Sequence, residues 1–268
     1  MIVGIISGYY RTGTTIMQKI YEEATGIPVL HEPTQHEIVK MMLWQGITKP
    51  NPLHGFEIFE GYTKIPFDTL KQFIKRHFEV FEDKTQHGVM TDFSSIVYLL
   101  QPFHECDVKV IIKTNQAWLH LDKLAKTFDC WIIHLMRHPV RIVAEHTTDI
   151  NLLESKDRPL PFYTNEVFTN LRKYLKEKEI PANRVKNIVK LRYILEKLEE
   201  IVKEQAKRCN NINLVDFDDF VMDPERERYK YIFGKKVIEK AKQLLDRKKI
   251  PHPPEWLYRL YSSSFHLV

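Results

Sequence analysis

The sequence predicts an α/β fold in which helices cover both faces of a central parallel sheet. Two observations lead to this prediction. The chain opens with a short apolar run, Ile-Val-Gly-Ile-Ile, and such runs are typical of strands buried on both faces. Between residues 88 and 153, further apolar runs alternate with helical patterns, and this alternation is typical of parallel sheets with crossover helices.

The first apolar run is followed by a loop and then by a helical pattern. Four residues recur at the spacing of one helix face: Met17, Ile20, Tyr21 and Ala24. Residues 26–30 form a second short apolar run, which is a predicted strand. After it, Thr34 and Glu37 have the spacing of a capping box, with Thr34 as the N-cap of the next helix.

An aromatic-rich insertion around residues 44–86 interrupts the alternation. Its part 46–64 fits either a lid or the wall of an acceptor pocket. A helix is predicted over 67–81 because apolar residues recur there at helical spacing, and we expect that face to pack in the core. These residues are Phe67, Leu70, Ile74, Phe78 and Phe81.

The alternation then resumes. Strands are predicted at 88–91, 108–112, 130–136 and from 213 onward, and helices at 94–103, 118–128, 140–153 and 182–208. The polar stretch 152–163, which contains prolines, is a predicted loop. Without an internal repeat or a clear boundary, we expect a single domain over residues 1–268, with a helical C-terminal part.

The composition excludes several classes of protein. With 268 residues, 43% of them hydrophobic, the chain can bury a core. No apolar run approaches the ~20 residues of a membrane span, and we expect no signal peptide before the first strand. The three cysteines lie far apart and the twelve histidines form no HExxH motif. We therefore expect no bound metal and a reducing, cytoplasmic setting.

The charge balance is mildly basic. A net charge of +5 fits an anionic small ligand as well as nucleic acid. Residues 226–249 hold ten Lys or Arg against three acids, and a solvated helix face is favoured there over a nucleic-acid patch. The many Lys and Glu residues weakly favour a thermophilic source.

The loop after the first strand has the strongest functional pattern. Its spacing, Gly8-x4-Gly13-Thr14-Thr15, is that of a Walker A loop in which Thr14 replaces the lysine, while Arg11 supplies a positive charge. The N–H groups of such a loop and of the following helix start bind phosphate. The alternative is a tight strand-to-helix turn with Thr14 or Thr15 as N-cap. The arginine among the glycines favours phosphate binding.

This loop resembles that of the sulfotransferase family. Those enzymes bind PAPS (3′-phosphoadenosine 5′-phosphosulfate) with a Lys/Arg-Ser/Thr-Gly-Thr-Thr loop. The resemblance implies a P-loop three-layer α/β sandwich, with PAPS as co-substrate and cationic side chains in place of a metal. It also implies that five consecutive residues hold the phosphosulfate: Arg11, Thr12, Gly13, Thr14 and Thr15.

A second resemblance lies after the strand at 130–136. Arg137-His138-Pro139 is similar to the family's Arg-x-Pro, which implies that Arg137 contacts the 3′-phosphate of PAPS. The family's serine eight residues further on is Glu145 here, with His146 and Thr147 as possible substitutes. The alternative for Arg137 is an ion pair at the strand end.

A third resemblance lies at Lys113-Thr114-Asn115, where cytosolic members of the family have Lys-Thr-His. The resemblance implies that Lys113 holds the transferring sulfonate. Asn115 cannot be the base, because an amide does not accept a proton at neutral pH. Other branches use a glutamate just past the second strand, and Glu32 lies there. We therefore assign the general base to Glu32, with His36 as the second candidate. The alternative is that each of the two is only an exposed loop residue.

The stretch 214–224 resembles the family's late Tyr-Glu-Asp-Leu…Asp-Pro segment, where we expect Asp218 and Asp219 to cap a helix. The expected activity is sulfonate transfer from PAPS to a hydroxyl or amine of a small-molecule or glycan acceptor. One alternative is an ATP-dependent phosphotransferase with Thr15 and Asp92 on Mg²⁺. Another is a non-catalytic nucleotide- or nucleic-acid-binding protein on the same scaffold, although nucleic acid is not the expected partner.

Overall fold

The computed structural model describes residues 1–9, 12–45, 57–138, 142, 196 and 199–245. The chain divides into two compact units, Met1–Met136 with Ile201–Lys248 and Arg137–Glu200 with Lys249–Val268. The predicted single domain stays a prediction. The strands and helices below all belong to the first unit.

A parallel sheet forms the centre of this unit, and its described strands follow the order β2-β3-β1-β4-β5. They are β1 (Ile2–Gly8), β2 (Val29–His31), β3 (Val110–Thr114), β4 (Trp131–Met136) and β5 (Ile212–Asp216). The central strands are almost entirely buried, which explains their continuous apolar runs. From β1 the chain continues to β2, which lies on one side of β1 in the sheet. From β4 it continues to β5, which lies on the other side. The strand order therefore reverses beside β1. Ligands of open α/β sheets bind at such points, outside the carboxyl ends of the strands.

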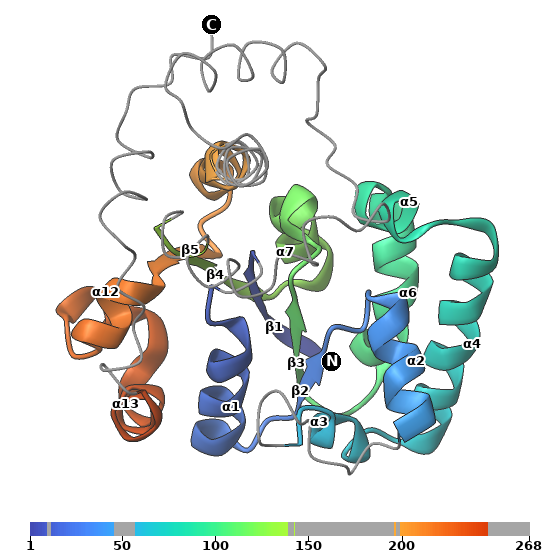
Figure 1. Ribbon diagram of the computed structural model, residues 1–268, viewed down its shortest axis with the longest axis horizontal. Helices are drawn as coiled ribbons and strands as arrows, with labels where there is room; N and C mark the ends of the chain where they lie inside the picture. Colours follow the sequence, from blue (N-terminus) through green and yellow to red (C-terminus); the bar gives the residue numbers. More distant parts are fainter. Residues whose placement is uncertain (10–11, 46–56, 139–141, 143–195, 197–198, 246–268) are drawn as a thin grey trace, which may run out of the picture. The chain divides into compact units, whose positions relative to one another are not determined.

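Helices cover both faces of the sheet, which confirms the predicted fold class. Figure 1 shows α1 and α13 on one side of the strands and α2, α4 and α6 on the other. Those helices are α1 (Thr14–Thr25), α2 (His36–Gln45), α4 (Phe67–Asp83), α6 (Phe93–Glu105) and α13 (Glu227–Leu244). Shorter helices are α3 (Glu60–Thr63), α5 (Gln86–Thr91), η1 (Trp118–His120), α7 (Leu121–Phe128) and α12 (Phe217–Met222).

Most predicted elements within the described residues are confirmed. Residues 199–208 are helical, as the predicted helix at 182–208 requires. The rest of that helix, the loop at 152–163 and all but Ile142 of the helix at 140–153 lie outside the described residues, apart from Glu196. All of α13 lies within the basic run 226–249, and the helix has a kink at Gly234.

The strand predicted at 88–91 is wrong, because this segment is helical in α5. The side chain of Thr85 accepts a hydrogen bond from the backbone N–H of Gly88 and caps the helix. The short apolar run fits either structure by pattern, and this cap stabilises the helix.

The predicted inner face of α4 is also wrong. Phe67 and Phe78 are 78% and 45% exposed, whereas Phe73 and His77 are completely buried. The core stripe is therefore rotated from the predicted one. The buried stripe includes His77, which is not apolar, so the pattern of apolar residues did not indicate this face.

No helix of the described residues is both long and apolar enough to cross a membrane. Cys106, Cys130 and Cys209 are free thiols. Burial raises the pKa of the Cys130 thiol to about 12.

Candidate functional site

The loop between β1 and α1 is shaped by two glycines. Gly13 has φ +90°, and a Cβ there would lie 2.4 Å from the ring of Phe217. A Cβ on Gly8 would lie 2.4 Å from Oγ1 of Thr12. A side chain at either position would collide with a neighbour, so the close approach of the chain to itself requires glycine.

Thr12 closes this loop rather than extending from it. Its Oγ1 and its backbone N–H both donate to the carbonyl of Tyr9, at 2.6 and 3.2 Å, and the residue is 2% exposed. The predicted cation, Arg11, lies outside the described residues. Thr12 therefore fixes the backbone on one side of the position that Arg11 occupies in the sequence.

The start of α1 has the character of an anion site. Gly13 precedes the helix without a side-chain cap, and the first turn of this 12-residue helix contains no acid. Its first N–H groups and the positive end of the helix dipole are therefore not neutralised by a local carboxylate. Thr14 and Thr15 lie in the first turn, so the alternative with either as N-cap is wrong.

Glu32 and Lys113 form a buried ion pair at the ends of β2 and β3. Lys113 Nζ lies 2.6 Å from Glu32 Oε1, and the second oxygen, Oε2, accepts the backbone N–H of Asn115 at 3.0 Å. The sequence predicted both residues for the site but did not predict that they pair with each other. The register places His31 beside Lys113, which brings Glu32 to the end of β3.

The backbone of Glu32 is unusual. Its φ is +49°, a left-handed conformation that a residue with a side chain adopts at some cost. Its N–H donates to the carbonyl of Lys113 at 2.8 Å, and its carbonyl accepts from Gln35 at 3.0 Å. These bonds hold the strained residue with its carboxylate directed at β3.

Asn115 connects this ion pair to the glycine loop. Thr14 Oγ1 donates to Asn115 Oδ1 at 3.0 Å, and the Asn115 N–H reaches Glu32. Thr14 and Asn115 are 3% and 6% exposed. One buried network thus runs from the start of α1 to Lys113. Sequence reasoning noted Asn115 only as a departure from the family pattern. A polar residue directly after a buried strand was the signal that could have identified this connection.

His36, the second candidate base, lies in the first turn of α2. Its Nδ1 lies 3.1 Å from Nε2 of the buried His77, and its ring stacks on Phe81 at 4.6 Å. Burial and, less strongly, Lys40 lower the pKa of His36, so this imidazole is neutral near pH 7. It can accept a proton only weakly, because the neutral form is favoured.

The predicted capping box at the start of α2 is wrong. The helix begins at His36, and the hydroxyl of Thr34 bonds to that of Thr114 at 2.9 Å. Gln86 holds the turn instead: its Nε2 donates to the Thr34 carbonyl at 2.9 Å, and its Oε1 accepts the His36 N–H at 2.9 Å. The sequence analysis did not find Gln86 or Thr114.

Other predicted residues lie elsewhere. Asp92 caps α6 and binds Lys84 and Ser95, which gives it a structural role and lowers its pKa to about 2. Asp216 caps α12, so the expected capping by Asp218 and Asp219 is wrong; these two lie in the first turn.

Arg137 begins the second unit, so its contact with PAPS stays a prediction. Glu145, His146 and Thr147 lie outside the described residues.

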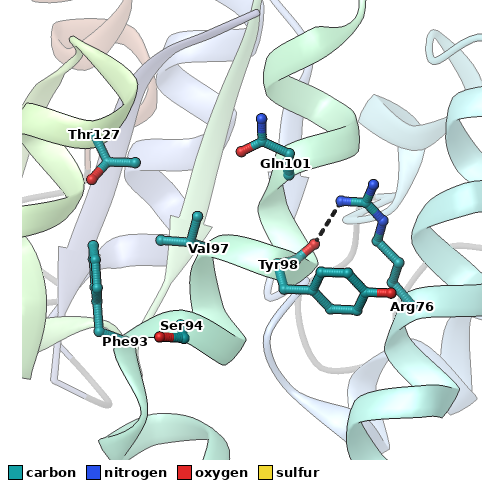
Figure 2. Close-up of a pocket in the computed structure, with 7 residues that line it drawn as sticks. All are labelled: Arg76, Phe93, Ser94, Val97, Tyr98, Gln101 and Thr127. Carbon is teal, nitrogen blue, oxygen red and sulfur yellow. Dashed lines mark hydrogen bonds between the residues drawn. The ribbon is translucent and has the colours of Figure 1, made fainter.

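The surface also has a cavity of about 380 Å³. Figure 2 shows its lining, with Phe93 and Val97 on one side and Arg76 beside Tyr98 on the other. Arg76 Nη1 donates to the backbone carbonyl of Tyr98 at 3.1 Å, and its guanidinium lies 4.7 Å from the centre of the Tyr98 ring. No residue predicted for the functional site lines this cavity.

Among the described residues, no group of three or more His, Cys, Asp or Glu is arranged to hold a metal.

No protein-family model matches the sequence. Over 149 residues the chain is 28% identical to an uncharacterized protein of Archaeoglobus fulgidus, a match that covers 53% of this chain and 46% of that protein. The chain thus spans about half the length of this relative.

Among solved structures, the chain is similar to the sulfotransferase STF9 from Mycobacterium avium. The TM-score is 0.44 and the identity 13%, over 97% of this chain and 74% of that one. A likeness of this size does not establish an activity.

Proposed function

We propose that this chain is a sulfotransferase-like enzyme that transfers a sulfonate from PAPS to a hydroxyl or amine of a small-molecule or glycan acceptor. The observation that carries the proposal is the buried network from Thr14 through Asn115 and Glu32 to Lys113. It joins an uncapped helix start to a cation and a carboxylate. An anionic donor and a proton-bearing acceptor need these three groups together.

The loop and the start of α1 suit the 5′-phosphate of the donor. Gly8 and Gly13 let the backbone turn tightly, and the first N–H groups of α1 have no side-chain cap. Arg11 would add a positive charge there. Arg137 would contact the 3′-phosphate, as the resemblance implies.

The chemistry is an in-line displacement at sulfur. The acceptor oxygen or nitrogen forms a bond to sulfur as the bond to the bridging phosphate oxygen breaks, and that oxygen keeps the electron pair. Glu32 would accept the acceptor's proton, with His36 as the second candidate. Lys113 would hold the sulfonate oxygens with the two N–H groups that Glu32 Oε1 does not occupy. Charge stabilisation and positioning would supply most of the rate, as in phosphoryl transfer.

The alternative is a phosphotransferase with Asp92 as a Mg²⁺ ligand. It is not favoured, because Asp92 has a structural role at the start of α6. A non-catalytic nucleotide-binding protein would share the loop but would not need the Glu32–Lys113 pair.

The experiment is a thermal-shift comparison with PAP (adenosine 3′,5′-bisphosphate), ADP, and ADP with Mg²⁺, on wild type and Arg11→Ala. The control is Arg208→Ala, which removes an arginine that is 62% exposed. A ligand at ~100 times its Kd stabilises by about 2.7 kcal/mol. We expect a shift with PAP that Arg11→Ala removes and Arg208→Ala keeps. A shift only with ADP and Mg²⁺ would favour the phosphotransferase, and no shift with any nucleotide would contradict the proposal.

A further inference from the structure

Asn115 carries hydrogen-bond donors that the described site leaves unused. Its Oδ1 accepts from Thr14 and its backbone N–H donates to Glu32. The residue is 6% exposed. Within the described residues, no group accepts a hydrogen bond from its Nδ2, and this nitrogen is not among the buried polar atoms shut off from solvent. A nearly buried amide thus keeps two N–H donors for a ligand.

The contact with Thr14 fixes the direction of this amide. Because the Thr14 hydroxyl donates to Oδ1, the NH₂ group faces the other way across the amide plane. Asn115 lies just past the end of β3, and its backbone N–H and the Lys113 ammonium bind the two oxygens of the same Glu32 carboxylate. The ammonium of Lys113 has three donors, of which Glu32 Oε1 takes one. The end of β3 therefore presents more donors than acceptors.

We propose that Asn115 is a catalytic residue whose Nδ2 donates a hydrogen bond to an oxygen of the transferring sulfonate. This inference rests on the proposed function and adds a group to it. A surplus of N–H donors suits an anion rich in oxygen. The amide stays neutral and forms no covalent bond, while the acceptor proton goes to Glu32 and the electron pair to the leaving phosphate oxygen. Where the family's cytosolic members have a base, this chain has a donor.

The test compares PAP, which lacks the sulfonate, with PAPS, which carries it. Asn115→Asp keeps an oxygen for the Thr14 hydroxyl and removes both N–H donors, whereas Asn115→Ala removes the side-chain amide without adding charge. The control is Asn211→Asp, the same change at an exposed residue. Binding of PAP is measured by thermal shift, and turnover of PAPS by its slow transfer of sulfonate to water, which needs no identified acceptor.

We expect the PAP shift of Asn115→Ala to equal that of wild type, because this variant adds no charge beside the phosphate loop, while PAPS turnover falls about 100-fold in both Asn115 variants, the usual loss for one such donor. Asn211→Asp should change neither. Wild-type turnover in both variants would overturn the inference. Loss of the PAP shift in both would also overturn it, because Asn115 would then only support the loop. If wild type itself does not bind PAP, the proposed function fails and this inference with it.

Discussion

Lys113 Nζ lies 2.6 Å from Glu32 Oε1, although the two side chains are only 3% and 2% exposed. Two charges removed from water depend on each other, because either one alone would be a buried, uncompensated charge. This dependence makes the pair measurable by mutation.

Glu32→Gln and Lys113→Met, made singly, should each lower the free energy of unfolding by about 3–5 kcal/mol, and the double variant should lose less than their sum. Thermal or urea unfolding measures this. The exposed pair Lys75–Glu79, 3.7 Å apart, is the control, and breaking it should cost less than about 1 kcal/mol. Additive losses at Glu32 and Lys113 would contradict the buried pairing.

Gly13→Ala should destabilise the protein and abolish the PAP shift. The added Cβ would meet the Phe217 ring at 2.4 Å, and φ is +90°. Gly26→Ala is the matched control, because Gly26 has φ +70° with no atom within 4 Å of the added Cβ. That change should cost only about 1 kcal/mol of backbone strain and leave PAP binding intact. Equal losses in the two variants would show that strain alone, without the collision, explains the effect.

Glu22 should make the protein less stable as the pH rises. Burial raises the pKa of its carboxyl from 4.5 to about 7, although its hydrogen bond from Val29 opposes this. Between these values the folded state binds more protons than the unfolded state, so stability falls with rising pH, by at most about 3 kcal/mol. Glu22→Gln should remove this part of the decline between pH 4.5 and 7. Unfolding curves across that range test it, and an unchanged slope in the variant would refute it.

His134 should make the protein sensitive to acid. Burial lowers its pKa from 6.5 to about 3, and its Nδ1 lies 3.2 Å from the hydroxyl of Ser7. The unfolded state binds the proton first as the pH falls below 6.5, so stability is lost between pH 6.5 and 3, on the order of 5 kcal/mol. His134→Asn, which can still bond to Ser7, should flatten the acid side of the stability profile. The slope is the readout, so a lower stability at pH 7 does not affect the test.

The strands of the sheet could be predicted because long apolar runs such as 130–136 have few alternatives. The run at 88–91 was predicted wrongly: this segment is helical, and Thr85 caps the helix. Glu32 could be found because it follows a predicted buried strand, the loop because of its glycine spacing, and Lys113 because of the resemblance to the family's Lys-Thr-His. The pairing of Glu32 with Lys113, and the link through Asn115, could not be predicted. They depend on which strands are neighbours, and that order is set by tertiary packing rather than by local pattern.

The contact of Gly13 with Phe217 has a consequence for the order in which the protein is made. The loop lies near the start of the chain and its packing partner near the far end, and at a synthesis rate of ~5–20 residues per second roughly 10–40 s separate the two on the ribosome. Before Phe217 is made, the ring that lies against Gly13 is missing. A nascent chain that stops short of α12 would thus carry the glycine loop without one of the walls that gives it its shape.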